Sequence, residues 1–167
     1  MQQDAGGSRL TRRQDAFGLV GFLLVCLIVS GIGGLVTASS VGGWYVTLNK
    51  PAFNPPDWVF APVWTILYLL MAVAAWRVWR STKKAARRAA LSVFGAQLAL
   101  NLLWSIFFFG FQQIGLALIE ILLLLSTIAL NTVLFWRIER LAGWLFVPYV
   151  LWVSYAAALN LALWLLN

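Results

Sequence analysis

Two amide side chains stand out in a segment that is otherwise apolar. Gln97 and Asn101 are followed by Trp104 and Phe108 at spacings of i, i+4, i+7 and i+11, which place all four residues on one face of a helix. An amide in apolar surroundings costs free energy unless it is hydrogen-bonded, so this face must point toward other protein segments. The amides either bond neighbouring helices together, for about 0.6–2 kcal/mol each, or contact a ligand.

A second face with the same kind of spacing lies near the end of the chain. Tyr149, Trp152, Ala156 and Asn160 are spaced i, i+3, i+7 and i+11. Ala156 is a small residue between large ones, and it leaves room beside a helix for a flat group.

A third aromatic stripe comes from Phe60, Trp64 and Tyr68, at i, i+4 and i+8. Aromatic stripes usually form ordinary core. Here, however, the stripes of the other two segments are interrupted by amides and a small residue. The combination favours a cavity for a large, flat, mostly apolar ligand over a solid core.

Residues for acid–base or nucleophilic catalysis are missing from these faces. The chain has no histidine, and its single cysteine, Cys26, lies in an apolar run, so we expect neither a catalytic site nor a metal site. Glu120 is the acid that lies well inside an apolar run. It has either a functional role or, because it lies only about one and a half turns from the end of its span, it snorkels to the interface or is protonated.

The composition is that of a membrane protein. Hydrophobic residues make up 62% of the 167 residues and charged residues 10%, against about 25% charged in soluble domains. Five apolar runs are each about 20 residues long, enough to cross the hydrocarbon layer of about 30 Å, and the first is longer than a signal-peptide core. We predict one all-α integral membrane domain (17–167), a bundle of five transmembrane helices at about 17–37, 58–79, 89–109, 115–136 and 144–166.

The first connection, residues 38–57, has an unusual composition. Pro51, Pro55 and Pro56 fall within six residues and fix an extended, stiff backbone. This loop forms either a lid over a pocket or a connection that only sets the angle between two helices. Residues 1–16 are polar and are expected to form a disordered cytoplasmic tail.

The basic residues predict the orientation. With five spans, eleven of the twelve Lys and Arg residues fall on one side, and only Lys50 falls on the other. The positive-inside rule then puts the N-terminus in the cytoplasm and the C-terminus outside. The net charge of +7 is interpreted as this topology signal and not as a nucleic-acid surface, because the charges only flank hydrophobic spans.

Five strings of residues together resemble bacterial members of the tryptophan-rich sensory protein/translocator protein family, also called the peripheral-type benzodiazepine receptor family. The resemblance covers about residues 17–166. The strings that carry it are Trp44-Tyr45, Asn49 to Pro56, Trp58 to Thr65, Gln97 to Ser105, and Pro148 to Trp152 with Leu159-Asn160.

This resemblance implies a porphyrin-binding membrane protein, commonly a homodimer, with a pocket under the first loop that also takes benzodiazepine-type or isoquinoline ligands. No cofactor is required, since the porphyrin is the ligand. Tyr45 enters the expected site through the resemblance alone. With the stripes above, the candidate ligand-binding residues are Tyr45, Trp64, Tyr68, Gln97, Asn101, Trp104, Tyr149, Trp152 and Ala156.

Several alternatives stay open from the sequence. The chain is a sensor or transporter of tetrapyrroles, an enzyme-like protein in whose pocket porphyrin is degraded by light, or a dimeric scaffold without a ligand. A dimer surface is offered by the small residues Gly95 and Ala99, with Gly31 and Gly34 as rivals. Inner and outer bacterial membranes are both compatible with the sequence.

Overall fold

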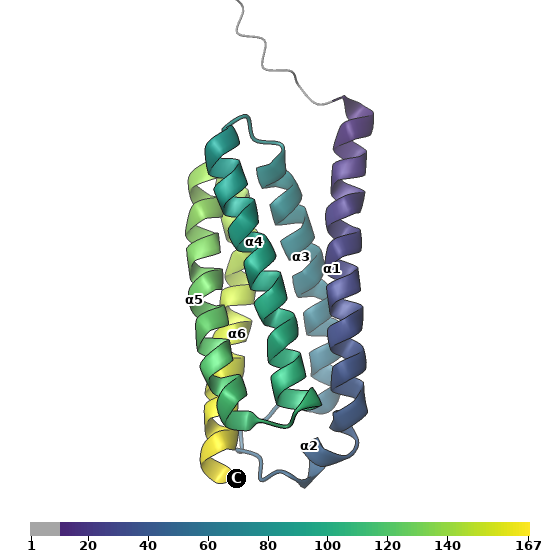
Figure 1. The fold of residues 1–167 in the computed structure, drawn as a ribbon, viewed down its shortest axis with the longest axis vertical. Coiled ribbons are helices and arrows are strands. Elements are labelled where there is room, and N and C mark those ends of the chain that lie inside the picture. Colours follow the sequence, from purple (N-terminus) through teal and green to yellow (C-terminus); the bar gives the residue numbers. More distant parts are fainter. Residues whose placement is uncertain (1–10) are drawn as a thin grey trace, which may run out of the picture.

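The structure, a computed structural model, describes residues 11–167 (Figure 1). Within this range, five helices are long and apolar enough to cross a membrane, which confirms the predicted all-helical membrane fold. A 3₁₀ turn, Asp57–Val59, leads into α3, and a π-helical turn, Ile106–Gly110, continues α4. The α-helices are α1 (Arg12–Val41), α2 (Trp44–Thr47), α3 (Phe60–Trp79), α4 (Lys84–Ser105), α5 (Ile114–Ile138) and α6 (Arg140–Leu166).

The first helix begins earlier than the sequence predicts. The Thr11 hydroxyl accepts a hydrogen bond from the backbone N–H of Gln14 (3.3 Å), and the Gln14 side chain accepts one from the backbone N–H of Thr11 (3.0 Å). This capping box satisfies two donors at the start of a helix. Residues 12–16, predicted as part of a disordered tail, are therefore helical, while the rest of that prediction lies outside the described residues.

Two other helices also extend into segments that were expected to be loops. The alanine-rich stretch after Lys84 has high helix propensity, so α4 starts about one turn before the predicted residue 89. The last helix starts at Arg140 and not at 144. The connection between α1 and α3 is shorter than predicted, because α1 continues to Val41. We call residues 42–59 the lid.

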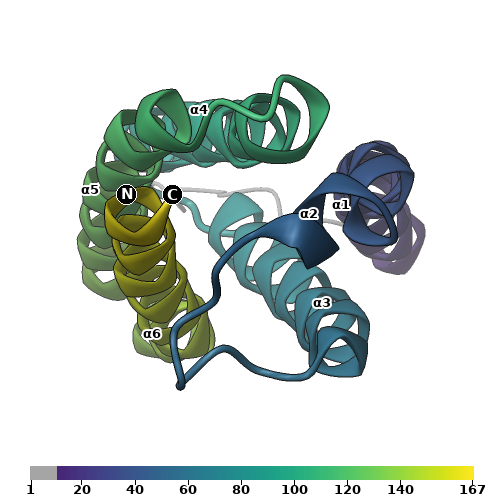
Figure 2. The same ribbon diagram turned by 90° about the horizontal axis from the view of Figure 1, so that it is seen from below.

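Viewed along their axes, the five long helices form a closed ring in the order α1, α3, α6, α5, α4 (Figure 2). The first helix, α1, packs against both α3 and α4 and thereby completes the ring. Gly143 allows close approach of α6 to α5, because a Cβ atom there would meet the Trp136 ring at 2.6 Å.

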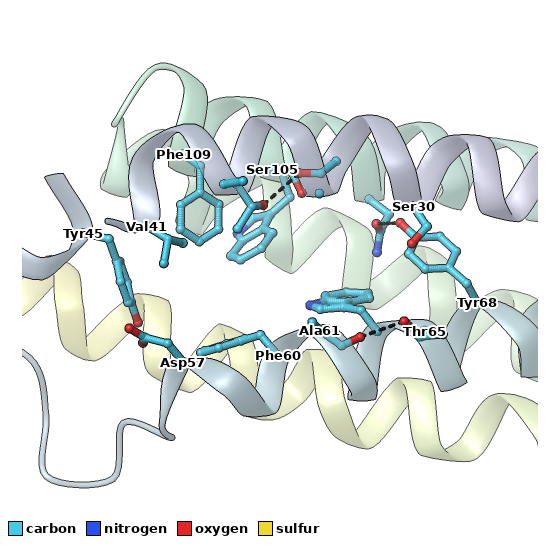
Figure 3. Close-up of a pocket in the computed structure, with 17 residues that line it drawn as sticks. Ser30, Val41, Tyr45, Asp57, Phe60, Ala61, Thr65, Tyr68, Ser105 and Phe109 are labelled. Carbon is cyan, nitrogen blue, oxygen red and sulfur yellow. Dashed lines mark hydrogen bonds between the residues drawn. The ribbon is translucent and has the colours of Figure 1, made fainter. Parts of the chain in front are cut away.

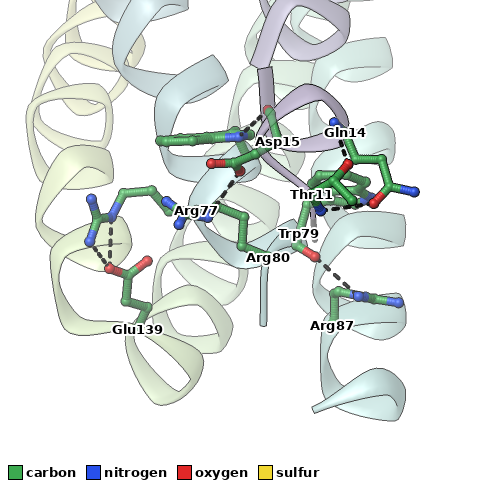
Figure 4. A network of polar contacts seen from close by, with 9 residues as sticks. Thr11, Gln14, Asp15, Arg77, Trp79, Arg80, Arg87 and Glu139 are labelled. Carbon is green, nitrogen blue, oxygen red and sulfur yellow. Dashed lines mark hydrogen bonds and ion pairs between the residues drawn. The ribbon is translucent and has the colours of Figure 1, made fainter. Parts of the chain in front are cut away.

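The two ends of the bundle differ in charge. At one end, which we call the basic end, Arg77 pairs with Glu139 and Arg80 pairs with Asp15 at 3.1 Å (Figure 4). Of the described basic residues, only Lys50 lies at the opposite end, which carries α2 and which we call the lid end. The basic end holds Arg12, Arg13, Arg77, Arg80, Lys83, Lys84, Arg87, Arg88, Arg137 and Arg140.

The buried side chains form two clusters. The larger one, the main core, runs through the basic half and the middle of the bundle, where α3 contributes the fully buried Ala72, Ala74 and Ala75. The smaller one, the lid cluster, lies at the lid end and contains Tyr45, Phe108, Phe109, Ala117, Leu159 and Leu163. The cavity described next takes its lining from both clusters.

Candidate ligand pocket

A cavity of about 370 Å³ lies inside the lid half of the ring. Its walls come from α1, the lid, α3 and α4 with its π-helical turn, and six of its seventeen lining residues are aromatic. Figure 3 shows Tyr45 and Asp57 at one end of the cavity and Tyr68 at the other. Of the nine predicted ligand-binding residues, those that line the cavity are Tyr45, Trp64, Tyr68, Asn101 and Trp104.

Asn101 provides the buried amide of this cavity. Its side chain is 3% exposed, and its Oδ1 atom accepts a hydrogen bond from the Tyr68 hydroxyl at 2.5 Å. Its Nδ2 atom donates to the hydroxyl oxygen of Tyr149 at 2.9 Å. An Asn side chain has two N–H donors, so one remains for a ligand after this bond.

Gln97 and Tyr149 stand behind Asn101 and are not among the described residues that line the cavity. The Tyr149 hydroxyl donates to Gln97 Oε1 at 2.9 Å, and Gln97 Nε2 lies 3.7 Å from the sulfur of Met71. The predicted amide face is therefore real, but its two members differ in role. Asn101 faces the cavity, whereas Gln97 and Tyr149 hold Asn101 in place.

Trp104 is oriented by a second polar contact. Its indole N–H donates to Asn160 Oδ1 at 3.1 Å, and Asn160 Nδ2 donates to the backbone carbonyl of Ile114 at 3.0 Å. The amide of Asn160, predicted to lie on the inward face of the last helix, thus links α4, α5 and α6 beside the cavity.

The other half of the predicted α6 wall lies elsewhere. Neither Trp152 nor Ala156 is among the described residues that line the cavity. The ring of Phe60, which does line it, makes an edge contact with the Trp152 ring at 6.0 Å between centroids. Trp152 instead borders a separate, apolar groove between α3 and α6. Phe60 therefore stands between the cavity and Trp152.

The wall that sequence reasoning missed belongs to α1. This helix contains no aromatic residue in its lid half, so no aromatic stripe marked it. The signal that was available is the set of small residues Ser30, Gly34 and Ala38, spaced i, i+4 and i+8. The α1 residues that line the cavity are Ser30, Gly33, Gly34, Thr37, Ala38 and Val41.

The π-helical turn changes which phenylalanine faces the cavity. A π turn inserts one residue into the helical spacing, so positions beyond it rotate. Phe108, predicted to continue the amide face, belongs to the lid cluster and stacks on Trp104 with 5.3 Å between the ring centroids. Phe109 lines the cavity instead. The Ser40 hydroxyl donates to the backbone carbonyl of Phe109 at 2.6 Å and ties α1 to this turn.

The lid is held down by polar contacts along its length. The Tyr45 hydroxyl donates to Asn54 Oδ1 at 2.8 Å, and Lys50 Nζ lies 4.2 Å from the centre of the Tyr45 ring. Near the end of the chain, the backbone N–H of Asn49 donates to Asn167 Oδ1 at 2.9 Å, and Asn167 Nδ2 donates to the Asn49 carbonyl at 3.1 Å. These contacts fix the proline-rich loop across this end of the bundle.

Tyr45 is the part of the lid that reaches into the cavity. It is 3% exposed, and burial together with the nearby Asp57 carboxylate raises the pKa of its phenol to about 12, although the hydrogen bond to Asn54 lowers it. The phenol is therefore protonated at neutral pH and acts as a donor. Asp57 is the one charged side chain among the described residues that line the cavity.

Glu120 lies outside the cavity lining. It is 6% exposed, and neither of its carboxyl oxygens has a hydrogen-bond partner within residues 11–167. An ionised carboxylate in this position would carry a large desolvation cost, so the position favours the protonated form.

Comparison with known proteins agrees with this architecture. The sequence model of the TspO/MBR family matches residues 22–165. The chain is 42% identical over 144 residues to the tryptophan-rich protein TspO of Chlorobaculum tepidum, which covers 86% of this chain and 91% of that protein.

Two more distant relatives give the same result. Identity to protein CrtK of Rhodobacter capsulatus is 35% over 147 residues, covering 87% of this chain and 90% of that protein. Identity to the translocator protein of Sus scrofa is 35% over 151 residues, covering 87% of each chain. The resemblance noted from the sequence is thereby confirmed, and the chain belongs to the TspO/MBR family.

Proposed function

We propose that this chain is a membrane sensor or transporter that binds porphyrins and related flat, apolar ligands in the cavity under the lid. The observation that carries the proposal is an aromatic-lined cavity with a single buried amide, Asn101, whose orientation is fixed by Tyr68 and Tyr149. Small-molecule sites combine an apolar lining with few, well-placed polar groups in this way.

The proposed contacts follow from the positions of the side chains. Trp64 and Trp104 offer indole faces to a flat ring, while Asn101 supplies one free N–H donor. Tyr45 closes the lid end above the ligand. Family membership supports the proposal further, since relatives carry the names translocator protein and tryptophan-rich sensory protein.

A full porphyrin requires more room than the cavity has in this conformation. The volume of about 370 Å³ lies near the lower limit of small-molecule sites, which run from about 300 to 1,000 Å³. We infer that the macrocycle displaces the ring of Phe60 and then reaches Trp152 and Ala156. This movement would unite the α3 and α4 walls with the predicted α6 wall.

Binding is tested by quenching of tryptophan and porphyrin fluorescence on the purified protein. Asn101→Leu removes the buried amide and should weaken porphyrin binding by about tenfold or more, about 1.4 kcal/mol. The matched control is Asn131→Leu, because Asn131 is a buried amide on α5 that bonds the carbonyl of Ala90 and lies outside the cavity lining among the described residues. Absence of saturable quenching in the unchanged protein would overturn the proposed function and favour a scaffold.

Light-dependent breakdown of the porphyrin is a second candidate function. It is favoured by the two indoles, Trp64 and Trp104, which line the cavity and which can exchange electrons with an excited macrocycle. The test is illumination of the saturated complex. This candidate function would be supported if illumination converts the porphyrin to new products in its complex with the unchanged protein, but not in its complex with a Trp64→Phe variant that still binds porphyrin.

A further inference from the structure

Several polar contacts hold the lid across the end of the cavity at which Tyr45 and the exposed Asp57 lie. Tyr45, which caps this end, is bonded to Asn54 within the lid, and Asn49 exchanges two hydrogen bonds with Asn167 at the end of α6. A third tie joins the lid to α6, since the Tyr155 hydroxyl donates to the carbonyl of Phe53 at 2.7 Å. A ligand entering from water would have to break several of these contacts.

The side of the cavity that faces the bilayer is open. Gly34 and Ala38 of α1, and Ala61 and Thr65 of α3, line the cavity and are themselves exposed. We call the opening between these four residues the membrane slot. All four are small, and a Cβ atom added to Gly34 would meet no other described atom within 4 Å.

Polar contacts fix both ends of α1, to α3 at the basic end and to the π-helical turn at the lid end. At the basic end, the Trp76 indole N–H donates to the carbonyl of Asp15 at 3.0 Å, and the Asp15 carboxylate pairs with Arg80 (Figure 4). At the lid end, Ser40 bonds the carbonyl of Phe109 on the α4 side of the ring. The lid end of α1 is thus hydrogen-bonded to the π-helical turn that continues α4.

Side-chain packing on α1 points the same way. The position of Gly33 faces Ser105 of α4, whose Oγ would lie 3.5 Å from an added Cβ atom. Gly34, the next residue, is turned away from α4 by the helical rotation of about 100° per residue. At this level of the helix, Gly33 therefore packs on α4, while the exposed Gly34 is turned away from α4, even though α3 is also an extensive partner of α1.

The border of the membrane slot is compatible with lipid. The hydroxyl of Thr65 donates to the carbonyl of Ala61 in its own helix at 2.8 Å. Thr37, which lines the cavity behind Ala38, likewise donates to the carbonyl of Gly33 at 2.8 Å. Neither threonine leaves a hydroxyl proton unpaired in the opening, so an apolar ligand passes without a desolvation cost there.

We propose that the ligand enters the cavity sideways from the bilayer through the membrane slot, while the lid stays closed. This inference rests on the proposed function and specifies its substrate class, namely flat apolar molecules that already partition into lipid. Association should then follow the concentration of ligand dissolved in the membrane and not its concentration in water.

The test measures porphyrin association by stopped-flow fluorescence with the full chain in lipid nanodiscs. Gly34→Leu places a bulky side chain in the membrane slot and should slow association by about tenfold or more. Gly21→Leu is the matched control, because Gly21 is exposed on the same helix and an added Cβ atom meets no described atom within 4 Å. Ala61→Leu narrows the membrane slot from the α3 side and should slow association in the same way. It replaces Gly34→Leu in the test if that variant does not fold.

A variant in the lid tests the alternative route, in which the ligand enters through the lid. Asn49→Ala removes the side chain that donates to the carbonyl of Leu166 and should loosen the lid. Entry through the membrane slot predicts an unchanged association rate in this variant, whereas entry through the lid predicts a faster one. Faster association in Asn49→Ala, with normal association in Gly34→Leu and Ala61→Leu, would overturn the membrane route. If the unchanged protein shows no saturable binding, the proposed function fails instead.

Discussion

The Tyr68 hydroxyl donates a 2.5 Å hydrogen bond to Asn101, and this contact joins α3 to α4 at the deep end of the cavity. The same amide donates to Tyr149 of α6. One side chain therefore joins three helices and at the same time has an N–H donor left at the cavity.

The first prediction concerns Tyr149. Its hydroxyl accepts from Asn101 and donates to Gln97, so Tyr149→Phe leaves one buried donor, Asn101 Nδ2, and one buried acceptor, Gln97 Oε1, without this partner. Unsatisfied buried groups cost about 1–3 kcal/mol each, although membrane-embedded bonds lie toward the low end. We expect a lower thermal melting temperature, together with weaker porphyrin binding because Asn101 is no longer oriented.

The control is Tyr155→Phe, which removes a tyrosine hydroxyl from the same helix. That hydroxyl bonds a lid carbonyl at an exposed position, so its loss should change the melting temperature little. Equal melting temperatures for Tyr149→Phe and the unchanged protein would contradict the positioning role.

The five spans were predictable because each physical requirement is local. A run of about 20 apolar residues is long enough to cross the hydrocarbon layer by itself, and basic residues mark its ends. The inward rotation of α4 was also predictable, because burying Gln97 and Asn101 in lipid would cost too much. The structure brings both amides inside the ring.

The rest of the site depends on distant contacts. The rotation of α6 is set by its packing on α3 and α5, and this places Trp152 behind Phe60, which helical spacing alone does not determine. The π-helical turn replaces Phe108 by Phe109 in the lining, and no residue pattern announced it. The α1 wall consists mostly of small residues. Nothing in the sequence marks such residues as part of a site, because their role depends on which segments pack beside them.

The second prediction concerns orientation. The basic end gathers nearly all the described Lys and Arg residues, and such ends stay in the cytoplasm. A cysteine introduced at Asn167, at the lid end, should react with a membrane-impermeant maleimide in intact spheroplasts. Cys26 is buried and serves as the silent background. If labelling at this position requires lysis of the spheroplasts, the predicted orientation is wrong.

The third prediction concerns pH. Because the pKa of Tyr45 is raised from 10.0 to about 12, the folded protein binds this proton more tightly than the unfolded chain does. The resulting stability is complete below pH 10 and is lost as pH rises from 10 toward 12. The contribution of Tyr45 to the melting temperature should therefore not vary with pH around neutrality, and it should decrease only in strong alkali.

Tyr45→Phe isolates this contribution, since the other tyrosines and lysines titrate in both proteins. The melting temperature of this variant should already be lower at neutral pH, because the bond to Asn54 is missing, and the difference from the unchanged protein should shrink above pH 10. A difference that grows with pH would contradict the assignment.

The fourth prediction concerns dimerisation. Gly95 and Ala99 are exposed on α4, and a Cβ atom added to Gly95 meets no other described atom within 4 Å. Small residues four apart permit close approach of a second helix. We expect Gly95→Leu to reduce the dimer fraction measured by cross-linking, with porphyrin binding retained. Gly31→Leu tests the rival surface on α1, and a loss of dimer in that variant alone would place the interface there.

The last prediction separates the α1 wall from the α6 wall by ligand size. Thr37 lines the cavity, so Thr37→Phe fills space that any ligand needs. Binding of both a porphyrin and a smaller isoquinoline-type ligand should fall by about tenfold or more. Thr127→Phe is the matched control, because Thr127 also bonds the carbonyl four residues earlier, at 2.8 Å, but is a half-buried residue of α5 outside the cavity lining of the described residues.

Ala156→Phe should behave differently. Ala156 lies outside the cavity lining of the described residues and becomes part of the site only after a macrocycle displaces Phe60. Porphyrin affinity should fall about tenfold, while the smaller ligand, which fits without that movement, should bind as before. Equal losses for both ligands would show that Ala156 already borders the smaller site. Normal porphyrin affinity in a folded Ala156→Phe protein would show that the site ends at Phe60.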